Sequence, residues 1–356
     1  MKSRVIYFTK YSAAGPSSRY RSYQYFLFLR NEFDLVYHPL FDDIYIQKLY
    51  ENKGHNIFKL IFYYFKRIFW VLRYLGSNNI LFIEYELLPY FPPVFEFLLS
   101  KTNNKLVFDY DDAIFHNYDL NDNLFVKFLF KKKISVIATY ADFIITGSPY
   151  LTSYFNQFNK NVIEIPTSII LKDYQLIDNL DDPSVVKIGW IGSNTTSVNI
   201  IEIKGVFEYF LKKNTNVLFL LMGFDPNLIA YIDLPNVNFL KWDKLNEKFF
   251  LNSIDIGIMP LNYTPTNNGK CGFKLIQYMA MAKPTISTPL DANVKINRNS
   301  NNLFSNSELD WINNIELFLD NRDAFANIGN FNRGIVEKYY SVESNFLEYV
   351  KLFSSL

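Results

Sequence analysis

Short apolar runs alternate with segments of mixed polarity along the whole chain. Runs of this length, bounded by turn residues, predict strands, and their alternation with helix-length segments predicts parallel sheets built from βαβ units. The predicted strands of a first series are Val5–Phe8, Asn79–Ile83, Lys105–Phe108, Ile144–Thr146 and Val162–Ile165. Those of a second series are Lys187–Ile191, Val217–Met222, Val237–Leu240, Ile254–Met259 and Thr285–Ser287.

A polar, turn-rich stretch, LKDYQLIDNLDDPS, separates the two series and is typical of a linker. The chain has 356 residues, more than one hydrophobic core usually serves. We therefore expect an α/β domain over residues 1–170, a linker over 171–184, a second α/β domain over 185–338, and a C-terminal helix over 339–356 that packs back on the first domain. Polar residues or glycines end the strands, where open α/β sheets bind ligands, so we expect the two sheets to face a cleft.

Composition narrows the function. Lys and Arg total 36 against 35 Asp and Glu, a net charge of +1, which argues against a dedicated nucleic-acid binder. The single cysteine, Cys271, cannot form an internal disulfide, and no metal cluster of Cys and His is expected. The N-terminal apolar run is too short for a signal peptide, and we find no run of about 18 apolar residues for a membrane span. These features predict a cytoplasmic protein.

The segment Ile57–Leu75 is apolar and aromatic, with Lys59, Lys66, Arg67 and Arg73 interspersed. One interpretation is an amphipathic helix of the first domain with a solvated basic edge, which is what such helices usually are. The other is a surface that rests on an anionic membrane.

The segment 268–293, NGKCGFKLIQYMAMAKPTISTPLDAN, predicts a glycine-containing loop, a helix over Lys274–Met281, a turn and a buried strand. Backbone amides at the start of such a helix, with the positive end of its dipole, favour an anion. Lys270 and Lys274 add positive charge at that end. The alternative is an ordinary connection with solvated lysines.

This segment resembles the donor-binding signature of family-four retaining glycosyltransferases, and in particular the bacterial surface-polysaccharide branch that reads G-K-C-x-x-K-L-x-Q-Y-M-A. IGWIGS, LNSIDIGIMPL, ADFIITGSPYL, VIEIPTSI, GPSSRYR and VFDYDDAIF also resemble segments of that branch, in the same order along nearly the whole chain. The resemblance implies the GT-B fold, which consists of two Rossmann-like domains, with the nucleotide sugar held mainly by the C-terminal one.

Within the signature, the resemblance assigns roles residue by residue. Gln277 lies where a family Glu accepts hydrogen bonds from ribose hydroxyls, and Gly269 lies where a second Glu would contact the donor sugar. Cys271, Gly272 and Phe273 match the loop whose amides approach the sugar and the diphosphate. No His lies near Cys271 in the sequence, so we expect a small loop residue there and not a nucleophile.

The first strand of the second domain ends at Gly192, Ser193 and Asn194. Ser193 lies where the family places a diphosphate-binding Arg, and no Lys follows at the usual short distance. A departing diphosphate still needs compensating charge, for which Lys270 and Lys274 are our candidates. Ser193 and Asn194 would add hydroxyl, amide and backbone donors.

Asp109, Asp111 and Asp112 directly follow a predicted buried strand. Three interpretations compete: a metal-binding D-x-D motif, a cap of the following helix by at least one Asp, and a carboxylate that orients the acceptor hydroxyl. The resemblance aligns Asp111 and Asp112 with a family His-Asp pair, and we favour them as the catalytic carboxylates. His116 is a weaker candidate.

The loop at Gly15, Ser17, Ser18, Arg19 and Arg21 also follows a predicted strand. Gly-Pro-Ser-Ser predicts a turn that lets the backbone approach a ligand. Arg19 and Arg21 are candidates to grip a phosphate of the acceptor or of the donor. The alternative is a helix start with two solvated arginines.

Together, the resemblance implies transfer of a sugar from a nucleoside diphosphate sugar to a glycan or lipid-linked glycan acceptor, with retention. It implies no metal and no cofactor, and a role in bacterial O-antigen or capsule biosynthesis. We expect a location in the cytoplasm, with peripheral contact at the inner face of the cytoplasmic membrane. Two alternatives stay open: a nucleotide-sugar epimerase of the same fold, and a catalytically degenerate partner protein that binds glycan.

Overall fold

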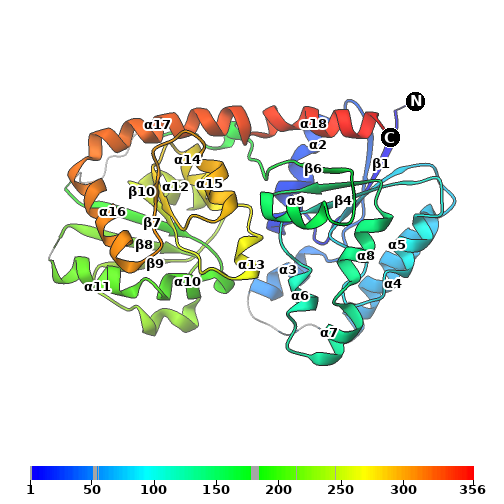
Figure 1. The fold of residues 1–356 in the computed structure, drawn as a ribbon, viewed down its shortest axis with the longest axis horizontal. Helices are drawn as coiled ribbons and strands as arrows, with labels where there is room; N and C mark the ends of the chain where they lie inside the picture. The colour runs from blue at the N-terminus through cyan, green and yellow to red at the C-terminus, as the bar shows by residue number, and fades with distance from the viewer. Residues whose placement is uncertain (1, 51–53, 55, 178–183, 214, 245) are drawn as a thin grey trace. The chain divides into compact units, whose positions relative to one another are not determined.

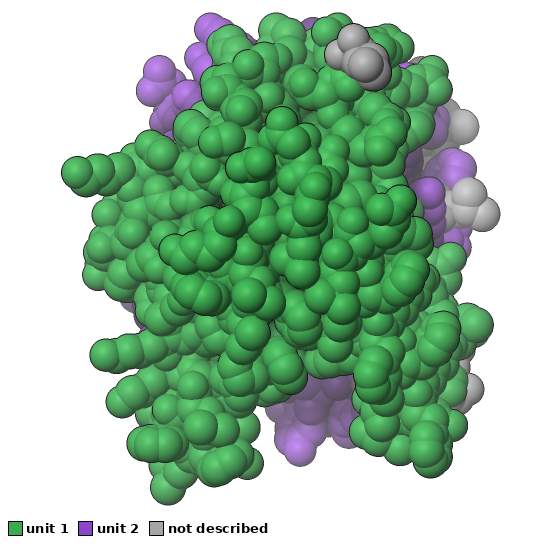
Figure 2. Space-filling model, turned by 90° about the vertical axis from the view of Figure 1, so that its right-hand side faces the viewer, with its two compact units in different colours: residues 1–168, 268–271, 342–356 green, residues 169–267, 272–341 purple. Residues whose placement is uncertain are grey.

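In the computed structural model, the chain divides into two units, coloured separately in Figure 2. Unit 1 comprises Met1–Ser168, Asn268–Cys271 and Val342–Leu356, and unit 2 comprises Ile169–Asn267 and Gly272–Ser341. The structure describes residues 2–50, 54, 56–177, 184–213, 215–244 and 246–356. Residues 178–183 of the expected linker therefore lie outside the described residues.

Unit 1 is built on a six-stranded sheet in the order β2-β1-β3-β4-β5-β6, in which every neighbouring pair is parallel (Figure 1). Its strands are β1 (Arg4–Phe8), β2 (Asp34–Tyr37), β3 (Ile80–Glu84), β4 (Lys105–Tyr110), β5 (Phe143–Thr146) and β6 (Val162–Glu164). Its longer helices are α3 (Asp43–Tyr50), α4 (Ile57–Tyr74), α7 (Leu124–Phe130), α8 (Lys133–Tyr140), α9 (Pro149–Phe155) and α18 (Val342–Ser354). The shorter ones are α1 (Pro16–Arg21), η1 (Tyr23–Tyr25), α2 (Phe26–Leu29), α5 (Val94–Leu99) and α6 (His116–Asp119).

Unit 2 has a second parallel sheet of six strands in the order β12-β11-β10-β7-β8-β9. Its strands are β7 (Val186–Ile191), β8 (Val217–Met222), β9 (Val237–Leu240), β10 (Ile256–Met259), β11 (Thr285–Ser287) and β12 (Leu303–Phe304). Its helices are α10 (Val198–Ile201), α11 (Lys204–Lys212), α12 (Asn246–Ser253), α13 (Pro265–Asn268), α14 (Phe273–Ala280), α15 (Asp291–Asn297), α16 (Glu308–Asp320) and α17 (Arg322–Tyr339). Its 3-10 helices are η2 (Leu171–Asp173), η3 (Asn194–Thr196) and η4 (Pro226–Tyr231).

The inner strands are buried on both sides, since helices surround each sheet (Figure 1). This explains why they are continuous apolar runs in the sequence, without the alternation of a half-exposed strand. The prediction of an α/β fold with two parallel sheets is confirmed. Each sheet, however, carries one strand that the apolar runs did not predict, β2 and β12, and each of these lies at an edge.

The C-terminal helix α18 packs within unit 1. Its Tyr349 ring lies 4.6 Å from the Tyr25 ring, and its Phe353 ring lies 5.5 Å from that of Phe33, centroid to centroid. Tyr349 and Phe353 are both buried. Across the described residues, the structure contains no helix with the length and apolarity to cross a membrane.

The register of the sheets brings the ends of neighbouring strands together. In unit 1, Glu84 at the end of β3 pairs with Asp109 of β4, and Tyr110 pairs with Thr146 of β5. In unit 2, Ile191 at the end of β7 pairs with Met222 of β8. Side chains that follow these strands therefore gather at the carboxyl edge of each sheet.

Candidate functional site

A buried ion pair lies beneath the loop that follows β1. The Nε of Arg21 donates to Oδ2 of Asp109 at 3.0 Å, a second nitrogen donates to Oδ1, and Nη1 donates to the carbonyl of Ile165 at 2.7 Å. Burial would lower the pKa of Arg21, but the Asp109 carboxylate raises it well above its ordinary value. The side chain of Arg21 is only 1% exposed, so the alternative of a solvated arginine is wrong. Its guanidinium is engaged by Asp109 and by the carbonyl of Ile165, and not directed to the phosphate for which we predicted it.

Asp111 and Asp112 lie beyond the end of β4 and are partly buried. The hydroxyl of Tyr85 donates to Oδ1 of Asp111, and the thiol of Cys271 donates to the Asp111 carbonyl at 2.8 Å. Burial and the neighbouring Asp112 carboxylate raise the pKa of Asp111 to about 6. Asp111 can therefore exchange a proton close to neutral pH.

The expectation that one of these aspartates caps the next helix is wrong. Helix α6 begins at His116, its N-cap is Phe115, and no side chain makes the cap hydrogen bond. Asp109 instead pairs with Arg21. His116 bonds to Asp119 of its own helix at 2.8 Å and to Tyr150 of α9 at 2.9 Å, so both of its ring nitrogens are engaged.

Glu84, at the end of β3, joins the cluster although we did not predict it. The hydroxyl of Ser18 donates to its carboxylate and lies 2.9 and 2.7 Å from the two oxygens, and the backbone nitrogen of Lys10 donates to it at 3.3 Å. Burial raises the pKa of Glu84 to about 8. The signal was in the sequence, because Glu84 directly follows an apolar run, as the aspartates do.

The predicted site residues of the loop after β1 divide between buried and half-buried positions. Ser18 is buried against Glu84, while the hydroxyl oxygens of Ser17 and Tyr85 lie 3.2 Å apart. Arg19 donates to the carbonyls of Ala13 and Ala14, at 3.0 and 2.8 Å. A side chain at Gly15 would lie 2.5 Å from Cβ of Tyr11, so only glycine fits there.

The segment Asn268–Cys271 belongs to unit 1, although the sequence places it in the C-terminal half. The Lys270 ammonium lies 3.0 Å from Oδ1 of Asp112, whose charge raises the pKa of Lys270. A Cβ on Gly269 would lie 2.4 Å from that of Ala113, which explains the lack of a side chain there. Burial raises the pKa of the Cys271 thiol well above its ordinary value, as expected of a packing residue and not a nucleophile.

In unit 2, Lys274 stands at the start of α14. Gly272 caps the helix with φ of 65°, a left-handed conformation that favours glycine. The Lys274 ammonium lies 3.2 Å from the hydroxyl of Thr196 and 4.7 Å from the ring centroid of Trp190. The structure therefore brings Lys274 to the end of β7, as the predicted donor site requires, whereas Lys270 lies with Asp112 in unit 1.

Gly192, Ser193 and Asn194 form the turn between β7 and η3. Ser193 and Thr196 make a reciprocal capping box around η3, and a Cβ at Gly192 would lie 2.1 Å from the Trp190 ring. Phe273, also predicted at the donor site, is half-buried against the unit 2 core.

Gln277 is buried one turn further along α14. Its amide nitrogen donates to Oε1 of Glu247 at 3.0 Å and to the hydroxyl of Tyr174 at 3.3 Å. The indole nitrogen of Trp242 donates to the other Glu247 oxygen at 2.7 Å. We did not predict this buried carboxylate, which lies far from Gln277 in the sequence and follows no strand.

Within the described ranges, no group of three or more His, Cys, Asp or Glu side chains is placed to hold a metal ion. Of the D-x-D motif at 109–111, Asp109 is already engaged by Arg21.

No protein-family model matches the sequence, and no curated protein matches it. Solved structures are similar over the full chain. Sucrose-phosphate synthase from Thermosynechococcus elongatus superposes with a TM-score of 0.73 at 13% identity, covering 100% of this chain and 99% of that one. HepE from Anabaena in complex with UDP has a TM-score of 0.72 at 12% identity, with 100% of both chains covered. A glycosyltransferase from Rickettsia africae has a TM-score of 0.73 at 13% identity, with 100% of this chain and 99% of that one covered. The fold is thus the GT-B fold of glycosyltransferases.

Proposed function

We propose that this chain transfers a glycosyl group from a nucleoside diphosphate sugar to a glycan or lipid-linked acceptor. HepE, which shares the fold, has been crystallised with UDP and with UDP-glucose. The observation that carries the proposal is the Lys274 ammonium at the start of α14, beside the turn that ends β7. A cation at a helix start, at the carboxyl edge of a parallel sheet, is suited to a diphosphate.

In the proposed donor site, Lys274 offsets the charge that develops on the departing diphosphate. Gly192, Ser193 and Asn194 at the end of β7, and Gly272 and Phe273 before α14, supply backbone and side-chain donors around it. Gln277 uses its amide nitrogen on Glu247 and Tyr174, so its carbonyl oxygen is the atom we assign to a ribose hydroxyl. Lys270 and Cys271, also predicted for the donor site, belong to unit 1, where Lys270 is paired with Asp112.

The proposed acceptor site lies among the carboxylates of unit 1. Asp111, with its pKa raised to about 6, is mostly ionised at neutral pH and would accept a hydrogen bond from the attacking hydroxyl. The donor C1–O bond breaks, the acceptor oxygen bonds to C1, and the acceptor proton passes to the leaving diphosphate. We propose retention, with attack from the face that the diphosphate leaves. Ser17 and Arg19 border this site.

The proposed setting is the assembly of a bacterial surface polysaccharide such as O-antigen or capsule, at the cytoplasmic face of the membrane. The sequence resemblance supports it, together with exposed apolar and basic residues of α4 that are suited to an anionic membrane. Metal independence is also part of the proposal, since protein cations and helix termini would carry the charge of the leaving group.

A thermal-shift screen with nucleoside diphosphates tests the donor site, since a ligand of the folded state raises the melting temperature. We expect at least one of UDP, GDP, ADP and dTDP to stabilise the protein. We then expect a sugar to be transferred from a donor that carries this nucleoside diphosphate to a lipid-linked acceptor. Stabilisation by none of them would count against the donor site. Isomerisation of the donor without transfer would favour an epimerase instead.

A further inference from the structure

Helix α4 of unit 1 carries apolar side chains on two faces. Tyr63 and Val71 are buried and serve the core. A second row of apolar side chains stays exposed along the helix: Ile57, Phe58, Ile61, Phe62, Phe65, Phe69 and Leu72. The expected helix that packs on the core of the first domain is therefore present, but the expectation of a solvated basic edge is wrong for Arg67, which is buried and donates to the carbonyl of Thr9. The exposed row, defined by these seven residues, indicates a partner of apolar character.

A groove of about 570 Å³ runs beside the exposed row. Its lining includes Phe41, Ile61, Phe65, Ile68, Leu88 and Phe91. The volume lies within the range of small-molecule sites, roughly 300–1,000 Å³. Phe65 of the exposed row lines the groove, whereas Phe62 and Phe69 of the same row do not.

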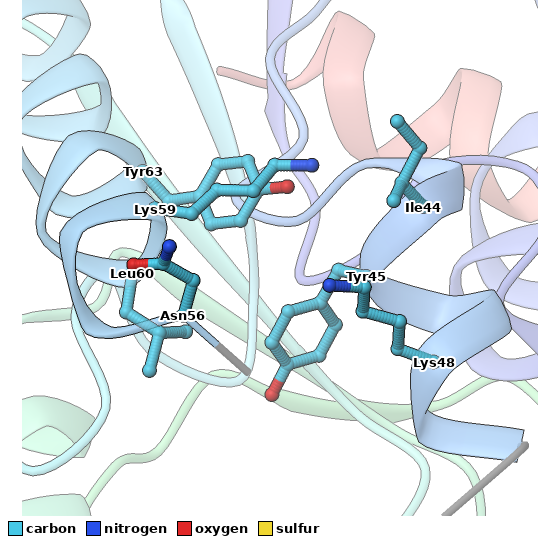
Figure 3. A pocket seen from close by; sticks show the side chains of 7 residues that line it. All are labelled: Ile44, Tyr45, Lys48, Asn56, Lys59, Leu60 and Tyr63. Atoms are coloured by element: carbon cyan, nitrogen blue, oxygen red, sulfur yellow. The ribbon is translucent and has the colours of Figure 1, made fainter. Parts of the chain in front are cut away.

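A second space between α3 and α4 is not a ligand site. It measures only about 10 Å³, which is no more than a single water needs. Figure 3 shows that Lys59 and Tyr63 of α4 and Tyr45 of α3 border it. Tyr45 and Leu60 also line the large groove, so the two spaces share a wall but only the groove can hold a chain.

Lys10 is the one charged residue among those that line the groove in the described part of the chain. Its ammonium lies 5.4 Å from the ring centroid of Tyr85, whose hydroxyl donates to Asp111. Burial would lower the pKa of Lys10, but Tyr11 and the carboxylates of Glu86 and Glu84 raise it on balance, which keeps the ammonium protonated. The groove therefore has an apolar length and a cationic point beside the carboxylate cluster.

We propose that the groove holds the apolar chain of a lipid-linked acceptor, with the phosphate of its head beside Lys10. This rests on the proposed transferase function and names the acceptor class of that site. Aromatic and aliphatic walls match a hydrocarbon chain, and the ammonium of Lys10 matches a phosphate. Lys59, Lys66 and Arg73, seven residues apart along α4, would face the anionic membrane from which the lipid enters.

The test measures binding of dodecyl phosphate below its micelle concentration by calorimetry, with dodecanol and inorganic phosphate as chain-only and head-only probes. Phe65→Ser and Phe69→Ser form a matched pair, since the two side chains are 67% and 60% exposed on one helix and only Phe65 lines the groove. We expect Phe65→Ser to weaken dodecyl phosphate binding about tenfold, from lost apolar contact, and Phe69→Ser to leave it unchanged. Lys10→Met should weaken dodecyl phosphate but not dodecanol.

An equal loss of affinity for dodecyl phosphate in both phenylalanine variants would show nonspecific binding to the apolar surface of the helix and overturn the groove assignment. So would wild-type protein that adsorbs to phosphatidylglycerol vesicles but does not bind dodecyl phosphate. UDP titration of the same samples separates this inference from the proposed function. UDP binding without dodecyl phosphate binding overturns the groove alone, and groove binding without any nucleotide binding overturns the donor site alone.

Discussion

Replacing Lys274 by methionine tests the donor site most directly. Methionine keeps much of the aliphatic stem and removes the charge, which lies 4.7 Å from the centroid of the Trp190 ring. The lost cation–π contact is worth about 0.5–1 kcal/mol, so the variant should melt only slightly below wild type. Lost nucleotide affinity would then report on the ligand contact and not on unfolding.

The magnitude follows from the single charge. A charge-assisted hydrogen bond to a diphosphate contributes about 1.5–3 kcal/mol, which corresponds to roughly a ten- to hundredfold weaker Kd for the nucleotide. The ammonium already lies 3.2 Å from the Thr196 hydroxyl, so it is held at the end of β7 before the ligand arrives. This favours the upper part of the range, since little side-chain entropy remains to be lost.

Isothermal titration calorimetry with UDP, at low and at high ionic strength, measures the effect. Wild-type affinity should fall with added salt more steeply than that of the variant, since the variant lacks the cation. The matched control is Lys204→Met, because Lys204 lies in the same unit and pairs with Glu208 on α11. An unchanged Kd in Lys274→Met, or an equal loss in Lys204→Met, would refute the placement of the diphosphate at Lys274.

Further predictions concern the carboxylate cluster. Asp111→Asn should lower kcat and kcat/KM together by about a hundredfold while leaving UDP affinity intact. In wild type, kcat should fall as pH drops through about 6, since protonation of Asp111 removes the acceptor contact. Normal turnover with early melting in the variant would make Asp111 structural. Activity should survive EDTA, and loss that Mn²⁺ restores would make the 109–111 motif a metal site. Arg21→Met should lower the free energy of unfolding in urea by about 3–5 kcal/mol, because it leaves Asp109 buried and unpaired; a loss below 1 kcal/mol would contradict this. The folded protein keeps Glu84 protonated up to about pH 8, whereas the unfolded chain loses this proton near pH 4.3. The contribution of Glu84 to stability is therefore full below about pH 4.3 and is lost as pH rises through 8. Denaturation at several pH values should show that Glu84→Gln reduces this dependence of stability on pH.

Most of the fold could be predicted from the sequence, because inner strands of parallel sheets are continuous apolar runs. Val217–Met222, Val237–Leu240 and Thr285–Ser287 have the predicted bounds. The strands β2 and β12 were not predicted, for a physical reason. β12 has only two residues, and β2 begins with the exposed Asp34 followed by three half-buried residues, so neither forms a buried apolar run.

The candidate site was only partly predictable. Asp111 could be located because it follows the end of a strand, and Lys274 because it stands at the start of a predicted helix. The contacts between such residues could not be predicted, because they join distant parts of the sequence. Arg21 and Asp109, for example, are 88 residues apart. The same holds for Gln277 and Glu247, which are joined only by tertiary packing.

The division of the chain between its units has a consequence for biosynthesis. Unit 1 contains the first residues of the sequence, but its core also needs Cys271 and the buried aromatic side chains of α18. Unit 2 ends at Ser341, before α18 begins. During translation, all residues of unit 2 are therefore made before α18, whereas the residues of unit 1 are complete only once α18 has been made. We expect a nascent chain stalled before α18 to expose the apolar seat of Tyr349 and Phe353, and to be the species that a chaperone binds.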